Sequence, residues 1–316
     1  MERKGEAGIL ERYGCIPMKI QAMQITEEKS LEKRGYQNPL FIGRGTYAAV
    51  YRVKHVVSGA FYACKMSSVE GLWKREQEIL EQLRHSLFPA YKESWQESGR
   101  YFLIMEYVPG QTLERLLQRR GCLMQQRAVK LGISLAEGLT YLEELPDAIL
   151  FRDLKAENVR IREDGRLKLL DLGCACPAKL SSRTFAGTVG YAAPEQLAPS
   201  GKAGAYSDVY AFGKLLHYML TGDNPCLPPI KKHKIRAYNK NLSVRLERLV
   251  EQCIQEEPKE RLPDMRCVLR RLYDVASEGQ SAGSIFDFFV QKAQGEEFLY
   301  EKNVFKSGSE NEKEES

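Results

Sequence analysis

The amino-acid sequence predicts an α+β fold of two lobes, a small β-rich lobe followed by a larger helical lobe. In the first third of the chain, short runs rich in aromatic and β-branched residues are separated by turn pairs such as Ser58-Gly59. Beyond Pro109-Gly110, apolar residues recur at three- and four-residue spacing, which is typical of helices packed on a core. The 316 residues, 43% hydrophobic and 28% charged, are ordinary for a globular protein and long enough to bury a sizeable core.

The small lobe is expected to consist of antiparallel strands and one helix. The stretches "LFIGRGTYAAVYRVKH" and "GAFYACKMS" form the first strands, from Leu40 onward, and "YFLIMEYV" forms a later one. Between them, "WKREQEILEQLRH" has helical spacing, with Trp73, Glu76, Ile79, Leu80 and Leu83 on one face. Residues 1–38 are highly charged and have no clear period, so a short helix and a flexible leader fit equally well.

The large lobe is expected to be mainly helical. One apolar stripe, closed by Pro146, comprises Ala128, Leu131, Leu135, Leu139 and Leu142. "DVYAFGKLLHYMLTG" predicts a second helix that stops at Gly222, and "VRLERLVEQCIQ" and "MRCVLRRLYDVA" predict two amphipathic helices. We therefore divide the chain into a leader of unknown structure (1–38), a small lobe (39–108), a large lobe (109–278) and a C-terminal extension (279–316). The end of this extension, "SGSENEKEES", has the composition of a disordered acidic tail.

Composition limits the partners of the protein. The net charge of +5 tolerates an anionic ligand but lacks the dense basic clustering of nucleic-acid-binding proteins, so no nucleic acid is expected. The N-terminus has no signal-peptide core, and the apolar run Tyr101–Met105 is too short to cross a bilayer. Eight scattered cysteines favour free thiols, and the pair Cys174 and Cys176 has no second pair at metal-site spacing. These features predict a cytoplasmic protein without a membrane segment; they do not determine its oligomeric state.

Two features of the small lobe could act on phosphate groups. Gly43 and Gly45 lie between two strands, where glycines let backbone amides approach phosphates; Ala48 stands where a third glycine is common, and an ordinary hairpin is the alternative. Lys65 lies on a strand among apolar residues, which is unexpected unless its charge is used. Glu76, eleven residues later on the following helix, is its expected partner, although a surface lysine on an edge strand would look the same.

The stretch "LFRDLKAEN" and the later "LKLLDLG" carry groups for phosphoryl transfer. Asp153 can orient a hydroxyl and accept its proton, Lys155 can stabilise charge on the transferring group, and Asn158 can offer an amide oxygen to a metal. Asp171, after an apolar run, can hold a divalent cation. Taken alone, each string also fits a solvated polar loop or a turn.

The order of these elements, completed by "AAPEQ" at 192–196, resembles the eukaryotic-type protein kinase family over roughly residues 40–275. The compact segment after Gly222 is most like bacterial eukaryotic-like serine/threonine kinases. The resemblance implies a two-lobed protein kinase-like fold that uses ATP and Mg²⁺, with Mn²⁺ as an alternative. It implies five catalytic residues, namely Lys65, Glu76, Asp153, Lys155 and Asn158, and two metal ligands, Asn158 and Asp171. The implied nucleotide-binding residues are Ile42, Gly43, Gly45, Val50, Ala63, Lys65, Met105, Glu106, Val108 and Asp171, with Met105 as gatekeeper beside the hinge 106–108.

The resemblance also assigns supporting residues and a substrate class. Asp208 is expected to steady the catalytic loop, and Arg261 is expected to pair with Glu195. Lys155 and Thr188 are typical of kinases that phosphorylate serine and threonine. We therefore expect a protein serine/threonine kinase acting on protein hydroxyls. The alternatives are a pseudokinase that serves as a nucleotide-binding interaction module and a small-molecule kinase with the same fold.

Two departures from the family pattern lie in the catalytic loop. Phe151 replaces a histidine whose main role in the family is packing, in a stack that here would include Leu80, Tyr91 and Leu172. An aromatic ring can fill that place at little cost, although the change could shift the balance between active and inactive states. Ala156 replaces a common proline, which removes a fixed φ but no reacting group.

Two further segments suggest regulation. Arg152 precedes the catalytic Asp153, as in kinases ordered by phosphorylation of the activation segment, and Ser181, Ser182 and Thr184 are the candidate acceptors, with Thr184 favoured. A basic cluster comprises Lys231, Lys232, Lys234 and Arg236. It is either a solvated loop or a docking site for an acidic partner.

Overall fold

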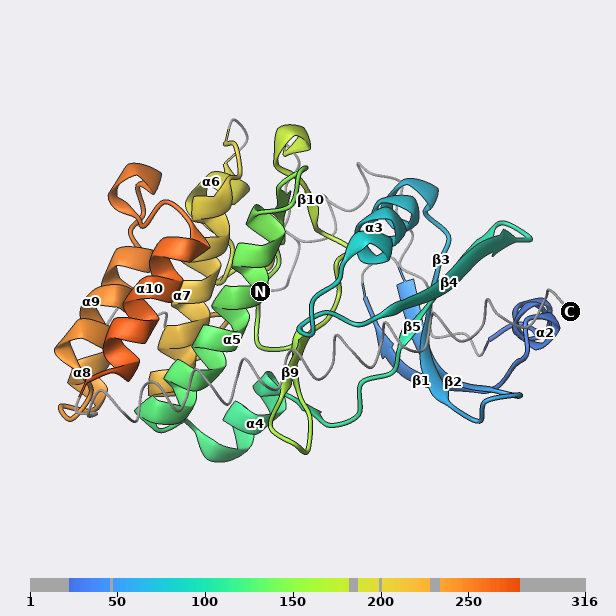
Figure 1. The fold of residues 1–316 in the computed structure, drawn as a ribbon, viewed down its shortest axis with the longest axis horizontal. Coiled ribbons are helices and arrows are strands. Elements are labelled where there is room, and N and C mark those ends of the chain that lie inside the picture. The colour runs from blue at the N-terminus through green and yellow to red at the C-terminus, as the bar shows by residue number, and fades with distance from the viewer. Residues whose placement is uncertain (1–22, 46–47, 182–186, 199–200, 228–233, 279–316) are drawn as a thin grey trace, which may run out of the picture.

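The computed structural model describes residues 23–45, 48–181, 187–198, 201–227 and 234–278, which form two lobes (Figure 1). The first lobe contains a five-stranded antiparallel sheet with the order β1-β2-β3-β5-β4. Its elements are α2 (Ile25–Lys33), β1 (Tyr36–Arg44), β2 (Ala48–His55), β3 (Phe61–Ser67), α3 (Glu70–Gln82), β4 (Tyr91–Glu97) and β5 (Arg100–Glu106).

One face of this sheet is directed at the second lobe. Val50 pairs with Lys65 across β2 and β3, and Ala63 pairs with Met105 across β3 and β5. Because side chains alternate along a strand, Ala63 and Lys65 share a face, and their partners share it with them. The predicted nucleotide-binding residues of the three central strands therefore form one surface.

The opposite face of the sheet carries a core of its own. Trp95 and Phe102 stack there with ring centroids 4.9 Å apart, and Leu31 of α2 packs on the same buried cluster. Polar contacts fix the helix: Glu27 forms a 2.8 Å ion pair with Arg100, and Trp95 donates a 2.9 Å hydrogen bond to Ser30. The segment for which a short helix and a flexible leader fitted equally well thus contains a helix, and the sheet begins at Tyr36.

The second lobe is built on long helices that pack side by side at the far end of the molecule from the sheet (Figure 1). Its helices are α4 (Leu113–Arg120), α5 (Gln125–Glu143), α6 (Pro194–Leu197), α7 (Ala205–Thr221), α8 (Ile235–Tyr238), α9 (Val244–Cys253) and α10 (Met265–Ala276). Short strands accompany them: β6 (Gln111–Thr112), β7 (Ile149–Leu150), β8 (Val159–Ile161), β9 (Leu167–Leu169) and β10 (Cys176–Pro177). Two 3₁₀ turns, η2 (Ala178–Leu180) and η3 (Pro258–Glu260), complete the described elements.

The sequence explains where the large helices begin and end. The side chains of Thr112, Ser243 and Asp264 accept hydrogen bonds from the first-turn amides of α4, α9 and α10. Gly222 ends α7 in the left-handed conformation, as the sequence predicts. The α+β class and the expected two-lobed arrangement are confirmed. The strand β4 was missed by the sequence analysis.

Candidate active site

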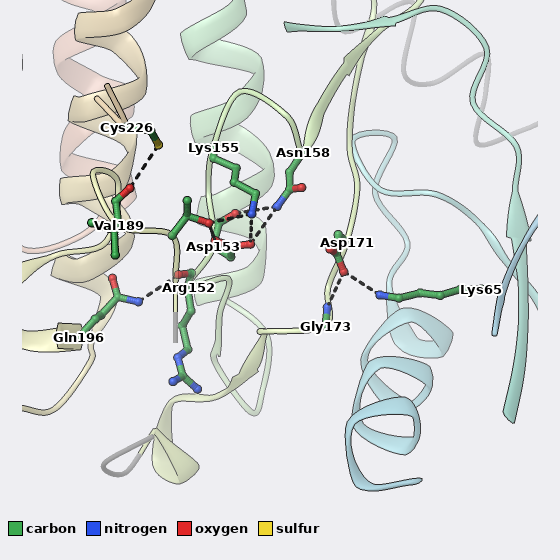
Figure 2. Close-up of polar contacts among 11 residues, drawn as sticks. Lys65, Arg152, Asp153, Lys155, Asn158, Asp171, Gly173, Val189, Gln196 and Cys226 are labelled. Atoms are coloured by element: carbon green, nitrogen blue, oxygen red, sulfur yellow. Dashed lines mark hydrogen bonds and ion pairs between the residues drawn. The ribbon is translucent and has the colours of Figure 1, made fainter. Parts of the chain in front are cut away.

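The first part of the site joins the two lobes through Lys65. Its ammonium nitrogen lies 2.7 Å from Glu76 Oε2 on α3 and 2.7 Å from Asp171 Oδ1 in the second lobe (Figure 2 draws Lys65 and Asp171). Burial acts to lower the pKa of Lys65, but the two carboxylates outweigh it and raise that pKa above its usual value. The Lys65 charge lowers the pKa of Asp171. Lys65 is therefore a fixed cation at the junction of the lobes.

The second part of the site is the loop 151–158, which the sequence predicts to be the catalytic loop. Lys155 Nζ donates to Asp153 Oδ2 at 2.8 Å and to Thr188 Oγ1 at 2.7 Å, and Thr188 Oγ1 donates to Asp153 Oδ1 at 2.7 Å. Asn158 donates its amide to the Asp153 carbonyl at 2.9 Å, which turns the amide oxygen away from Asp153 (Figure 2). Asp153 is thus held on both carboxylate oxygens, in a position to orient a hydroxyl group.

Asp208 holds the backbone of this loop at its start. Its two oxygens accept the backbone amides of Phe151 and Arg152, each at 2.7 Å. Burial raises the pKa of Asp208 to about 6, although the two amide hydrogen bonds act in the opposite direction. These bonds hold Arg152 at φ 70°, a left-handed conformation that a long side chain seldom adopts. The strain is consistent with a loop whose shape is fixed by its surroundings.

Phe151 is fully buried in the core that joins the lobes. Leu80 and Leu172 are buried in the same cluster, and Tyr91 packs against it half-buried. The four expected members of the stack therefore belong to one hydrophobic core, and the residue that replaces histidine is an apolar part of it.

The end of the activation segment is anchored by a buried ion pair. Arg261 meets both oxygens of Glu195, at 2.8 and 3.0 Å, and its side chain is completely buried. Burial acts to raise the pKa of Glu195, but hydrogen bonds from Arg261 and Ser207 outweigh it and lower that pKa. Nearby, the Cys226 thiol donates to the Val189 carbonyl (Figure 2).

The predicted nucleotide-binding residues lie between these parts and the sheet. Ile42 and Gly43 lie at the end of β1, beside a register shift, and a Cβ added to Gly43 would meet nothing within 4 Å. Glycine is therefore not required at this position by close packing inside the protein; its missing side chain leaves open space above the backbone. Val108 is buried at the exit of the hinge, and Gly45 donates its amide to the Ala48 carbonyl.

The donor set fits a hard divalent cation. The Asn158 amide oxygen makes no hydrogen bond to any described residue, and the Asp171 carboxylate is 41% exposed. Within the described ranges, no cluster of three or more His, Cys, Asp or Glu residues could hold a metal. Two oxygen ligands suit Mg²⁺, which usually completes its coordination with water and substrate phosphates.

Several predicted regulatory residues are only partly described. Ser182, Thr184, Lys231 and Lys232 lie outside the described residues. Ser181 is buried and donates to the Ala203 carbonyl at 2.8 Å, so its hydroxyl is not offered to solvent. Lys234 forms an exposed ion pair with Glu251.

Within the described residues, neither the thiols nor the helices indicate a disulfide or a membrane span. All seven cysteines within the described residues are free. None of the helices in that same part of the chain combines the length and the apolar character needed to traverse a bilayer.

Comparison with known proteins identifies the family. The protein kinase domain matches residues 36–273. The chain is 32% identical over 194 residues to a human "Putative serine/threonine-protein kinase PRKY", covering 58% of this chain and 68% of that protein. It is 26% identical over 279 residues to a Caenorhabditis briggsae "cAMP-dependent protein kinase, catalytic subunit-like" protein, covering 83% and 71% respectively. A Dictyostelium discoideum "RAC family serine/threonine-protein kinase homolog" is 28% identical over 252 residues, covering 72% and 55%.

The chain therefore belongs to the protein kinase family. The kinase fold and the enzyme class expected from the sequence, a protein serine/threonine kinase, are confirmed. The finer likeness to bacterial members stays a prediction. Two residues with charged contacts to the hinge, Arg162 and Lys168, were missed by the sequence analysis. The signal for Lys168 was a lysine inside the apolar run "LKLL".

Proposed function

We propose that this protein is an active kinase that transfers the γ-phosphoryl group of ATP to serine and threonine hydroxyls of protein substrates. The observation that carries the proposal is the double restraint on Asp153 by Lys155 and Thr188, at 2.8 and 2.7 Å. A carboxylate so oriented can direct a substrate hydroxyl and take its proton. The hydroxyl oxygen then bonds to the γ-phosphorus, the bond from that phosphorus to the β–γ bridging oxygen breaks, and ADP leaves.

The other residues supply binding and charge. Lys65, held by Glu76, is suited to the nucleotide phosphates, and Lys155 is suited to the charge that develops on the transferring group. Asn158 and Asp171 would hold Mg²⁺, or Mn²⁺ in its place, which when bound neutralises phosphate charge. The hinge 106–108 and the surface of Val50 and Ala63 are suited to the adenine ring.

The pseudokinase alternative requires loss of a reacting group. Lys65, Asp153 and Asp171 are all present, and each is held by an ion pair, Lys65 with Asp171 and Asp153 with Lys155, so no observation favours it. We include in the proposal a cytoplasmic location, which rests on composition alone, and autophosphorylation of the activation segment with Thr184 as the favoured acceptor.

Transfer of label from γ-labelled ATP tests the proposal. Wild-type protein is expected to label itself and a serine/threonine peptide in the presence of Mg²⁺, whereas Asp153→Asn should label neither while retaining its melting temperature and ATP affinity. Equal labelling by both proteins would refute the assigned mechanism. Peptide mass spectrometry after ATP treatment tests autophosphorylation separately, because an unmodified segment between 178 and 188 would exclude it.

A further inference from the structure

A lysine of the β8–β9 hairpin lies against the hinge. Lys168 Nζ donates to Glu106 Oε2 at 2.7 Å and to the Phe88 carbonyl at 2.9 Å, and its side chain is only 13% exposed. A lysine is seldom buried to this extent unless its charge is paired. The two acceptors come from separate segments, the hinge and the connection that follows α3. One ammonium group therefore ties both segments to the second lobe.

Glu106 is held on several sides. Its carboxylate also accepts the Ala90 amide at 3.2 Å and Arg162 at 3.3 Å, and its own backbone amide donates to the Ala90 carbonyl at 2.8 Å. Arg162 is itself 3.4 Å from Asp164, at the tip of the same hairpin. The first residue of the hinge is thus fixed through both its backbone and its side chain.

The hairpin also touches the chain at Gly110, two residues beyond the hinge. Gly110 has φ 113°, and a Cβ added there would lie 2.1 Å from the Ile161 carbonyl oxygen of β8. Only glycine allows this approach. Contacts at Glu106 and at Gly110 therefore bracket the segment that is suited to the adenine ring.

The base of the same hairpin carries the candidate metal ligands. Asn158 immediately precedes β8, Asp171 follows β9 by two residues, and the Leu170 amide donates to the Asn158 carbonyl at 2.7 Å. One hairpin would thus position both the residues that contact the adenine end of a nucleotide and those that contact its phosphate end. Two side chains of the hairpin reach Glu106 of the hinge, and Lys168 makes the shorter contact, at 2.7 Å against 3.3 Å for Arg162.

We infer that Lys168 is a positioning residue for nucleotide binding. By binding Glu106, it fixes the distance between the hinge and the candidate metal ligands Asn158 and Asp171, which lie at the base of the same β8–β9 hairpin. The inference rests on the proposed function, since it assumes that ATP is the phosphoryl donor. Lys168 touches no reacting atom. Its removal should therefore weaken ATP binding much more than it slows the transfer step.

The test compares Lys168→Met with Lys168→Arg and with Lys130→Met, a control at an exposed lysine on α5. For each protein the ATP KM, the kcat for a peptide substrate, the ATP dissociation constant and the melting temperature are measured. Loss of a hydrogen bond to a charged group should raise the ATP KM of Lys168→Met about tenfold. Its kcat should change less than about twofold, Lys168→Arg should recover most of the affinity, and Lys130→Met should match the wild type.

The outcomes separate this inference from the function on which it rests. An unchanged ATP KM in Lys168→Met, beside a wild type that binds and uses ATP, would overturn the positioning role alone. A fall in kcat and melting temperature with normal ATP affinity would also overturn it, since that pattern indicates a structural role only. A wild type that neither binds ATP nor labels a peptide would overturn the proposed function and the inference with it.

Discussion

The guanidinium group of Arg261 and the carboxylate of Glu195 form a two-pronged ion pair in which the arginine side chain has no exposure to solvent. The contact joins the segment after α9 to the end of the activation segment. Arg261 also donates to the carbonyls of Tyr206 and Gln255. The pair is thus part of a network that anchors the end of the activation segment to the second lobe.

Arg261→Ala should strongly destabilise the protein, because it leaves the Glu195 carboxylate buried without its cation. Breaking such a pair costs about 3–5 kcal/mol. Denaturant unfolding monitored by fluorescence measures this change. The matched control is Arg245→Ala, whose arginine side chain is 65% exposed in its pair with Glu278, and it should cost less than about 1 kcal/mol. Equal losses in both variants would contradict the structural role of Arg261.

Thr188→Ala should lower kcat while leaving the fold intact. The Thr188 hydroxyl bridges Lys155 and Asp153 on a half-buried loop, so its loss frees one oxygen of the Asp153 carboxylate, the proposed catalytic group. One lost hydrogen bond to a charged group corresponds to roughly a ten- to hundredfold fall in rate. Steady-state peptide phosphorylation measures it, and Thr188→Ser should keep most of the activity. If serine and alanine behave alike, the hydroxyl has no such role.

Phe151→Ala should be among the most damaging changes in the second lobe. The ring is fully buried with Leu80 and Leu172, and emptying such a position costs about 3–5 kcal/mol. Val57→Ala, at a side chain that is 89% exposed, serves as the control for a truncated apolar residue. A separate variant, Phe151→His, restores the histidine that is usual in the family. A greatly raised kcat in this variant would show that Phe151 stabilises the active conformation less well than histidine does.

Leu31→Ala should show that α2 is part of the folded kinase domain, although the family match begins only at Tyr36. Leu31 is 1% exposed against the outer face of the sheet, so truncation should cost about 2–5 kcal/mol. Ile25→Ala on the same helix removes an aliphatic side chain that is 71% exposed and should change little. Equal stability of the two variants would indicate that α2 does not contribute to the core.

The sequence named most residues of the candidate site because the family's motifs are short and occur in a fixed order. Lys65, Asp153 and Asp171 could be found in this way although they lie far apart in the chain. The edge strand β4 escaped because its "YKESWQE" buries only Trp95, so its period is hidden by charged residues. Helix α2 stayed one of two equal alternatives for a related reason: it docks through Glu27 and Ser30 as well as Leu31, a mixture that gives no apolar stripe.

The contacts of Glu106 could not be predicted from a motif. Its partners come from two separate stretches of chain: Lys168 and Arg162 lie on the β8–β9 hairpin, and Ala90 lies in the connection after α3. In the sequence, each of them looks like an ordinary charged or small residue. Only the folded arrangement of the hairpin against the hinge brings them together. Long-range polar pairs of this kind have no local signature.

Glu143→Gln should change how stability depends on pH. Burial raises the pKa of Glu143 to about 8, with Asp208, Asp264 and Glu144 adding to the shift and the Met265 amide opposing it. Because the folded protein holds this proton more tightly than the unfolded chain, the group favours folding at low pH, and this contribution is lost as pH rises from about 4.5 to about 8. Glutamine keeps an acceptor for the Met265 amide but cannot ionise.

The wild type should therefore lose stability relative to Glu143→Gln as pH rises through this window. Urea unfolding at several pH values between 5 and 8 measures the difference in unfolding free energy, and Glu144→Gln, at the neighbouring exposed carboxyl, provides the control. A wild type and a Glu143→Gln variant whose stabilities run parallel from pH 5 to 8 would show that Glu143 is ionised in the folded protein. In that case the Met265 amide, which lies 3.1 Å from Glu143 Oε2, outweighs the burial of the carboxyl group.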